Sequence, residues 1–133
     1  MGRRTSVAVA GALASLLVFA GAADASKWVG KATNLKGDFN YGKVTFTVKG
    51  GFIRNLTIRA VTTKSDEIPF TTVVLPKAKI TGGTFFGRKS YPLLPGDMEV
   101  VEAGGTIRGS VAKGRFNQGP LIDCEGKFTT RKQ

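Results

Sequence analysis

The sequence predicts an all-β domain, an antiparallel meander of about eight short strands that closes as a small barrel or folds as a two-sheet sandwich. Two observations lead to this prediction. After residue 25, apolar and polar residues alternate along most of the chain, and pairs of glycines separate the alternating runs. A meander of this size has to remove its exposed strand edges, which either closure or packing of two sheets achieves.

The clearest strand is predicted over Lys43–Lys49. Its apolar residues share one face, namely Val44, Phe46 and Val48, whereas lysines and threonines occupy the other. This alternation is typical of a half-buried strand with one face in water.

The next strand is predicted over Phe52–Val61, after a turn at Gly50-Gly51. Its inner face is expected to carry Leu56, Ile58 and Ala60. Because Ile53 lies three residues before Leu56, the pattern also predicts a bulge near Asn55.

Glycines predict further turns, at the pairs Gly82-Gly83 and Gly104-Gly105 and at Lys113-Gly114. A loop is expected over Tyr91–Gly96. The remaining strands are expected at Trp28–Thr33, Phe70–Leu75, Met98–Glu102, Thr106–Ala112 and Cys124–Arg131. In the last strand Cys124 alternates in phase with Phe128. We therefore expect its thiol to point inward and to react slowly.

The first 25 residues have the features of a secretion signal. Arg3 and Arg4 precede an apolar run over Val7–Ala20, which is too short to cross a membrane as a helix. Ala23-Asp24-Ala25 then fits the small-x-small pattern of a cleavage site. The sequence predicts cleavage after Ala25, or alternatively after Ala22, with any helix confined to the signal peptide. The product would be one secreted or envelope-associated domain, residues 26–133, without a transmembrane span.

The charge of the chain favours anionic partners. The 20 basic and 9 acidic residues become 18 and 8 after removal of residues 1–25, which leaves a net charge of +10. Such a surplus attracts teichoic acids, acidic polysaccharides, anionic lipids and nucleic acid, although export argues against nucleic acid. The composition does not indicate an oligomeric state.

Several segments together suggest a family. Trp28-x-Gly30, the run Gly42–Ile53 followed by Leu56, and Cys124-x-Gly126-x-Phe128-Thr129 resemble small secreted β-proteins of actinobacteria, whose function is uncharacterised. The resemblance implies the fold and brings no catalytic residues. Those proteins often carry a second cysteine on the strand that here spans Leu56–Thr63. The resemblance therefore implies that Cys124 is the remaining half of a lost disulfide.

Few residues are available for catalysis. The chain has no histidine and one cysteine, which excludes histidine-dependent hydrolases and zinc sites built on histidine or on several thiolates. Asp97, Glu99 and Glu102 form the only acidic cluster, and the first two are expected to share a strand face. A solvated start of a strand is the preferred interpretation, and a catalytic carboxylate pair is the alternative. We expect no enzymatic activity, no cofactor and no metal.

Basic and aromatic residues remain as candidates for recognition, because cations hold anionic groups and rings stack on sugars or bases. The candidates are Lys43, Lys49, Arg59, Arg88, Lys89, Tyr91, Arg108, Lys113 and Arg115. The predicted function is a non-catalytic module that associates with anionic envelope or extracellular polymers through dispersed charges. Two alternatives are a small barrel that binds an apolar ligand and an inhibitor-like module that presents the Tyr91–Gly96 loop.

Overall fold

The computed structural model of the protein describes residues 25–63 and 70–133. The predicted signal peptide lies outside this range apart from Ala25. Secretion and cleavage therefore stay predictions. Within the described residues, no helix is long and apolar enough to cross a membrane.

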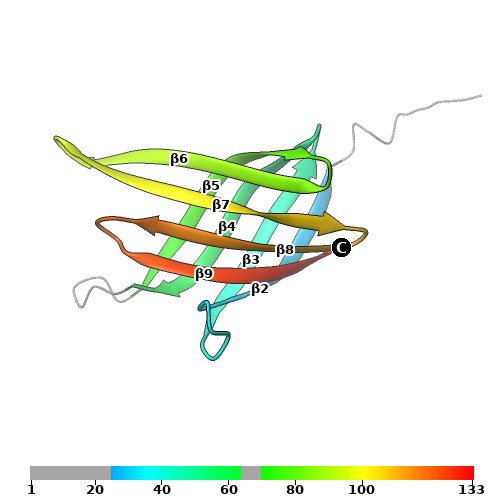
Figure 1. Ribbon diagram of the computed structural model, residues 1–133, viewed down its shortest axis with the longest axis horizontal. Coiled ribbons are helices and arrows are strands. Elements are labelled where there is room, and N and C mark those ends of the chain that lie inside the picture. The colour runs from blue at the N-terminus through cyan, green and yellow to red at the C-terminus, as the bar shows by residue number, and fades with distance from the viewer. Residues whose placement is uncertain (1–24, 64–69) are drawn as a thin grey trace, which may run out of the picture.

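Eight strands of the described chain form a closed antiparallel barrel in which each strand pairs with its neighbours in sequence. They are β2 (Ser26–Thr33), β3 (Asn40–Lys49), β4 (Phe52–Thr62), β5 (Phe70–Thr81), β6 (Thr84–Leu94), β7 (Asp97–Arg108), β8 (Val111–Gly119) and β9 (Cys124–Lys132). Figure 1 shows β6 to β9 lying across the oblique strands β2 to β5. The predicted meander is confirmed, and closure as a barrel decides against the two-sheet sandwich.

The barrel closes between its first and last strands. Trp28 on β2 pairs with Phe46 on one side and with Lys132 on the other. Gly30 makes this closure possible, because a Cβ atom at that position would lie 1.8 Å from the backbone oxygen of Thr129. A glycine within a strand commonly marks such a close approach of a second backbone.

The join between β5 and β6 differs from the others. Backbone pairing covers three residue pairs, from Lys79↔Phe86 to Thr81↔Thr84. Farther along, the hydroxyl of Tyr91 donates a hydrogen bond of 3.0 Å to the carbonyl of Val74. The side chain of Tyr91 therefore links β5 and β6 beyond their backbone-paired residues.

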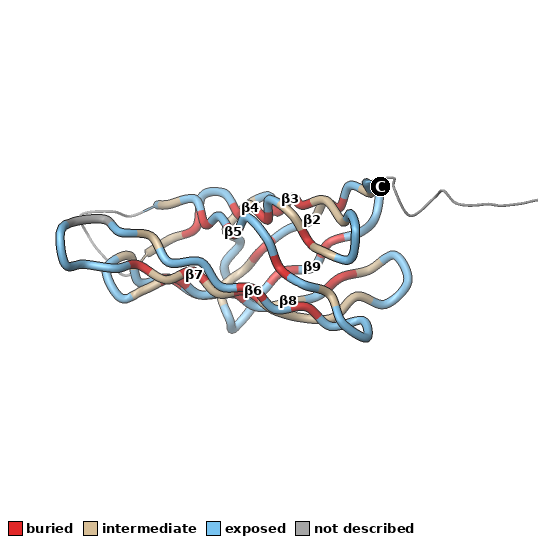
Figure 2. Tube along the Cα trace, turned by 90° about the horizontal axis from the view of Figure 1, so that it is seen from above, coloured by how far each residue is buried: buried red, intermediate tan, exposed pale blue. Residues whose placement is uncertain are grey.

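Large apolar side chains occupy the interior. Buried and exposed segments alternate along the strands in Figure 2, as expected for a barrel with one wet face. The core includes rings from several strands: Trp28, Phe46, Phe85, Phe116 and Phe128. Cys124 is 2% exposed and belongs to this core, which confirms its predicted inward position.

The predictions for β3 and β4 hold with one exception. Val44 and Phe46 are buried, and the bulge near Asn55 is present, with a backbone φ of 55° at that residue. Ala60, however, is exposed rather than inward. It also has a positive φ, and a second register shift places Val61 in the core instead.

Two of the predicted glycine turns are wrong, whereas those at Gly50-Gly51 and Gly82-Gly83 are confirmed. Gly104-Gly105 lies within β7, which joins the strand predicted over Met98–Glu102 to the first part of the strand predicted over Thr106–Ala112. The chain turns next at Gly109-Ser110, where Gly109 has φ 60°, and β8 runs straight through Gly114. Gly114 serves packing, because a Cβ there would lie 2.7 Å from the ring of Phe128.

The loop predicted over Tyr91–Gly96 is also largely a strand. β6 continues to Leu94 and pairs with the start of β7, and the turn is confined to Pro95-Gly96. The inhibitor-like alternative loses the long loop on which it depended.

Candidate functional site

A basic hollow lies on the outer surface of β2, β7, β8 and β9. It encloses about 730 Å³ and is open to solvent. Four cationic side chains line it, namely Lys31, Lys113, Arg115 and Lys127, and the residues that line it include no carboxylate. We call this surface the basic hollow.

Strand register brings these cations together. Arg115 on β8 is directly opposite Lys127 on β9. One step along the ladder, Lys113 is opposite Thr129, which in turn pairs with Lys31 on β2. Like charges directly opposite each other destabilise a sheet, and a bound anion would relieve that repulsion.

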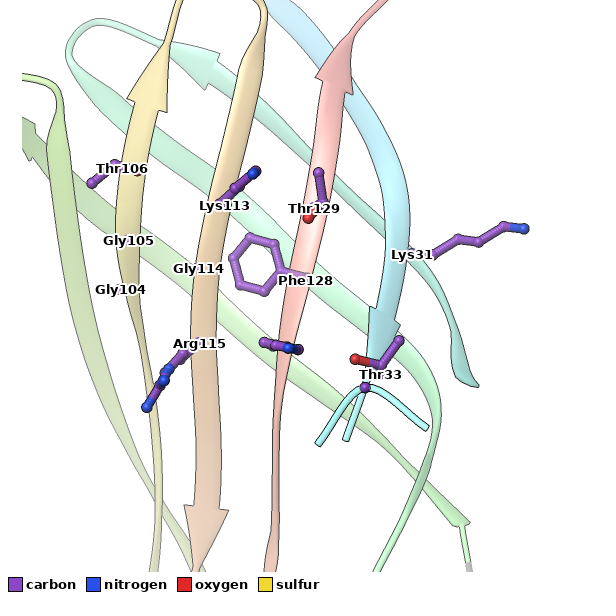
Figure 3. Close-up of a pocket in the computed structure, with 12 residues that line it drawn as sticks. Lys31, Thr33, Gly104, Gly105, Thr106, Lys113, Gly114, Arg115, Phe128 and Thr129 are labelled. Atoms are coloured by element: carbon purple, nitrogen blue, oxygen red, sulfur yellow. The ribbon is translucent and has the colours of Figure 1, made fainter. Parts of the chain in front are cut away.

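The floor of the hollow consists largely of backbone. Figure 3 shows Lys113, Thr129 and Lys31 at one level on neighbouring strands, with Lys31 extending outward at the edge. Between the cations lie glycines and threonines: Gly104, Gly105, Gly114, Thr33, Thr106 and Thr129. Gly104, which is paired with Arg115 on the outer face, leaves the surface low there, and the hydroxyls of Thr106 and Thr129 can donate hydrogen bonds to an anionic oxygen, whereas that of Thr33 donates to the carbonyl of Asn34 at 2.9 Å.

The glycines are required by the fold as well as by the hollow. A Cβ on Gly105 would lie 2.0 Å from the backbone oxygen of Lys113. At Gly104, the Phe86 ring lies about where a side chain would point, 3.2 Å from the position of a Cβ. A side chain at Gly105 would therefore meet the backbone of β8, and one at Gly104 would meet the ring of Phe86.

Two of the nine predicted binding residues, Lys113 and Arg115, lie in the basic hollow. Lys43 on β3 is directly opposite Lys31 and extends the positive surface beyond the hollow. Arg108 lies near it, two residues along β7 from Thr106.

The other predicted residues are dispersed. Arg88 faces Glu102, with 3.8 Å between a guanidinium nitrogen and a carboxylate oxygen. The ammonium of Lys89 lies 5.9 Å from the centre of the Tyr91 ring. Lys49 pairs with Phe52 at the β3–β4 hairpin, and Arg59 lies on β4. The predicted set is therefore not a single site.

Two residues of the basic hollow, Lys31 and Lys127, were missed by the sequence prediction. Both occupy outward positions of strands whose inward residues were recognised. The signal that could have found them is the pairing of the last strand with the first, which places β9 and β2 side by side.

No family model, curated protein or solved structure matches this chain. The function therefore has to be inferred from the geometry of the site.

The acidic cluster is not arranged as predicted. Glu99 is fully buried, whereas Asp97 is exposed at the start of β7, so the solvated interpretation is wrong for Glu99. One carboxylate oxygen of Glu99 accepts a hydrogen bond of 2.8 Å from the backbone N–H of Leu121, and the other accepts from that of Ile122. The side chain of Gln118 donates a further bond of 3.4 Å.

These bonds give Glu99 a structural task. Its buried carboxylate holds the segment between β8 and β9 by accepting hydrogen bonds from two backbone N–H groups of that segment. Over the residues that the structure describes, no three of the side chains His, Cys, Asp and Glu come together as metal ligands would.

Burial and charge both act on Cys124. Burial raises the pKa of its thiol from 9.0 to about 11, and the negative charges of Glu99, Asp123 and Glu125 act in the same direction. A hydrogen bond to the backbone of Gln118 opposes them. Because the pKa is raised in the folded state, its contribution to stability is complete below pH 9 and is lost as the pH rises through 11.

We expect a bulky thiol reagent at pH 8 to label native Cys124 about a hundredfold more slowly than the denatured chain, because so little thiolate forms. Mass spectrometry over time would measure both rates. The rate should rise steeply toward pH 11. Native labelling as fast as denatured labelling would show that Cys124 is accessible.

Proposed function

We propose that this protein is a non-catalytic β-barrel module that binds anionic polymers through the basic hollow. The observation that carries the proposal is the set of four cations around a low floor of backbone and hydroxyl groups, with no carboxylate among the residues lining it. Arginine and lysine on such a surface attract carboxylate, phosphate or sulfate groups.

An extended ligand fits this surface better than a single small ion. The cations are distributed over β8, β9 and β2, and Lys43 continues the positive surface onto β3. Adjacent strands are about 4.8 Å apart, so the charged row spans several monomers of a polymer. Secretion, if it occurs, would deliver this surface to envelope or extracellular polymers.

The alternative of an apolar ligand inside the barrel is less well supported. The rings of Phe85 on β6 and Phe128 on β9, which are not neighbouring strands, lie 6.3 Å apart in the interior, and Trp28 stacks on its cross-strand neighbour Phe46 at 5.7 Å. Side chains packed in this way occupy the space that an interior ligand would need.

We expect the barrel, residues 26–133, to bind polygalacturonate with an affinity that falls steeply with salt. Release of counterions gives a slope of about −0.7 in log K against log salt for each contacted charge of a single strand, so four contacts predict about −3. Replacing both Arg115 and Lys127 by Gln should weaken binding about tenfold or more and make the slope shallower by about 1.4. Isothermal titration calorimetry at several salt concentrations would measure both quantities.

The matched control is the double variant Lys49→Gln, Lys79→Gln. It removes the same charge from positions that pair with Phe52 on β4, away from the hollow. This control should lose little affinity. Equal losses in the two variants would mean that net charge alone attracts the polymer, and salt-independent binding would contradict the proposal altogether.

A further inference from the structure

A second, smaller hollow adjoins the basic hollow. It encloses about 210 Å³ and is lined by Phe86, Glu102, Ala103, Gly104, Arg115 and Asn117. Gly104 and Arg115 line both hollows, so the two are continuous across β7 and β8. We call this second surface the aromatic hollow.

Phe86 supplies an exposed ring beside the cations. It is 59% exposed, although it belongs to a strand, as the third residue of β6, and is paired with Gly104 rather than lying in a loop. Phe52, two strands away, is covered by cations, since the ammonium of Lys77 lies 4.2 Å from its ring centre. Phe86 thus offers a planar apolar surface next to Arg115.

Polar groups of different kinds surround this ring. Asn117 pairs with both Glu102 and Glu125 across the outer face of β7, β8 and β9. An amide both donates and accepts hydrogen bonds, a carboxylate accepts them, and a guanidinium holds an anionic group. A sugar that carries hydroxyls and a carboxylate can use all three, while its apolar ring face stacks on Phe86.

Glu102 distinguishes this ligand from a polyphosphate. Its carboxylate accepts hydrogen bonds from hydroxyl groups but repels a closely placed phosphate. Arg88, at 3.8 Å, is an exposed partner and offsets only part of that charge. Combined with a planar ring, the carboxylate favours a hydroxyl-bearing polyanion.

We infer that the polymer bound by this protein is an acidic polysaccharide, with one sugar ring stacked on Phe86 and its carboxylate on Arg115. This inference rests on the proposed function of the basic hollow and adds a subsite to it. Neighbouring sugars would place their carboxylates along Lys127 and Lys113, which lie on the same outer face.

The test compares two polyanions, polygalacturonate and inorganic polyphosphate, on the same variants. Phe86→Leu keeps an apolar cover over Gly104 but removes the planar ring. It should weaken polygalacturonate binding about tenfold and leave polyphosphate binding unchanged, because only the sugar stacks. Glu102→Gln should strengthen polyphosphate binding by removing a repulsion. The matched control is Phe70→Leu, which alters a ring that is 61% exposed on β5.

Each outcome decides one question. If Phe86→Leu binds polygalacturonate like the wild type while binding stays salt-dependent and needs Arg115 and Lys127, the stacking subsite is wrong and the proposed function stands. If the variant weakens both polymers equally, the preference for a sugar is wrong. If the wild type binds neither polymer at low salt, the proposed function itself fails.

Discussion

Replacing Glu99 with alanine should lower the free energy of unfolding by about 2–5 kcal/mol, because it removes the fully buried carboxylate that accepts hydrogen bonds from the N–H groups of Leu121 and Ile122. Urea denaturation followed by tryptophan fluorescence would measure the loss, since Trp28 lies in the core and is the only tryptophan. The first element to loosen should be the connection between β8 and β9.

The variant Glu99→Gln tests whether both carboxylate oxygens are needed. Each oxygen accepts a backbone hydrogen bond, so an amide would place its NH₂ group against an N–H donor. We expect the free energy of unfolding to fall in Glu99→Gln, but by less than in Glu99→Ala. Glu102→Gln, on the same strand but only partly buried, is the control and should change stability by less than about 0.5 kcal/mol. If Glu99→Ala lowers the free energy of unfolding no more than this control does, the role assigned to Glu99 is wrong.

Gly30→Ala should have an effect of similar or greater size, because the added Cβ would overlap the backbone of β9 at Thr129 and Thr130. Overpacking costs about 1–3 kcal/mol where side chains can move, and a backbone obstacle at 1.8 Å leaves less room to adjust. A loss of about 3 kcal/mol would lower the midpoint of thermal unfolding by more than about 10 °C in a domain of this size. Differential scanning calorimetry would measure the shift.

Gly104→Ala provides a graded comparison. Its nearest backbone neighbour, the oxygen of Phe85, would lie 3.0 Å from the new Cβ, so the required adjustment is much smaller than at Gly30. The shift in midpoint should be correspondingly smaller. Equal shifts for the two variants would mean that closure between β2 and β9 does not depend on the close approach at Gly30.

Alternation along the strands was sufficient to predict an all-β meander, although it left barrel and two-sheet sandwich open. Val44, Phe46, Cys124 and Phe128 all point inward as their period of two requires. Side-chain alternation is a local property of a strand, so it can be recognised in the sequence without knowledge of partners.

Features that depend on neighbouring strands were not predictable in the same way. Gly114 and Gly104-Gly105 resemble turns, yet they lie within strands because another backbone or a ring approaches them. Glu99 looked like a surface acid, since the backbone donors that it binds lie 22 and 23 residues later in the chain. The basic hollow likewise needed the pairing of β9 with β2, which joins opposite ends of the chain.

The central claim is that the basic hollow, rather than net charge, binds an anionic polymer. Titration of ¹⁵N-labelled protein with short oligogalacturonates, followed by NMR, tests it most directly, because Gly105 and Gly114 line the basic hollow, whose lining does not include Lys49 or Lys79. If the basic hollow binds the polymer, shifts will concentrate at Gly104, Gly105 and Gly114 and at their neighbours Arg115 and Lys127. Shifts that are absent there, or that concentrate around Lys49 and Lys79, would contradict it.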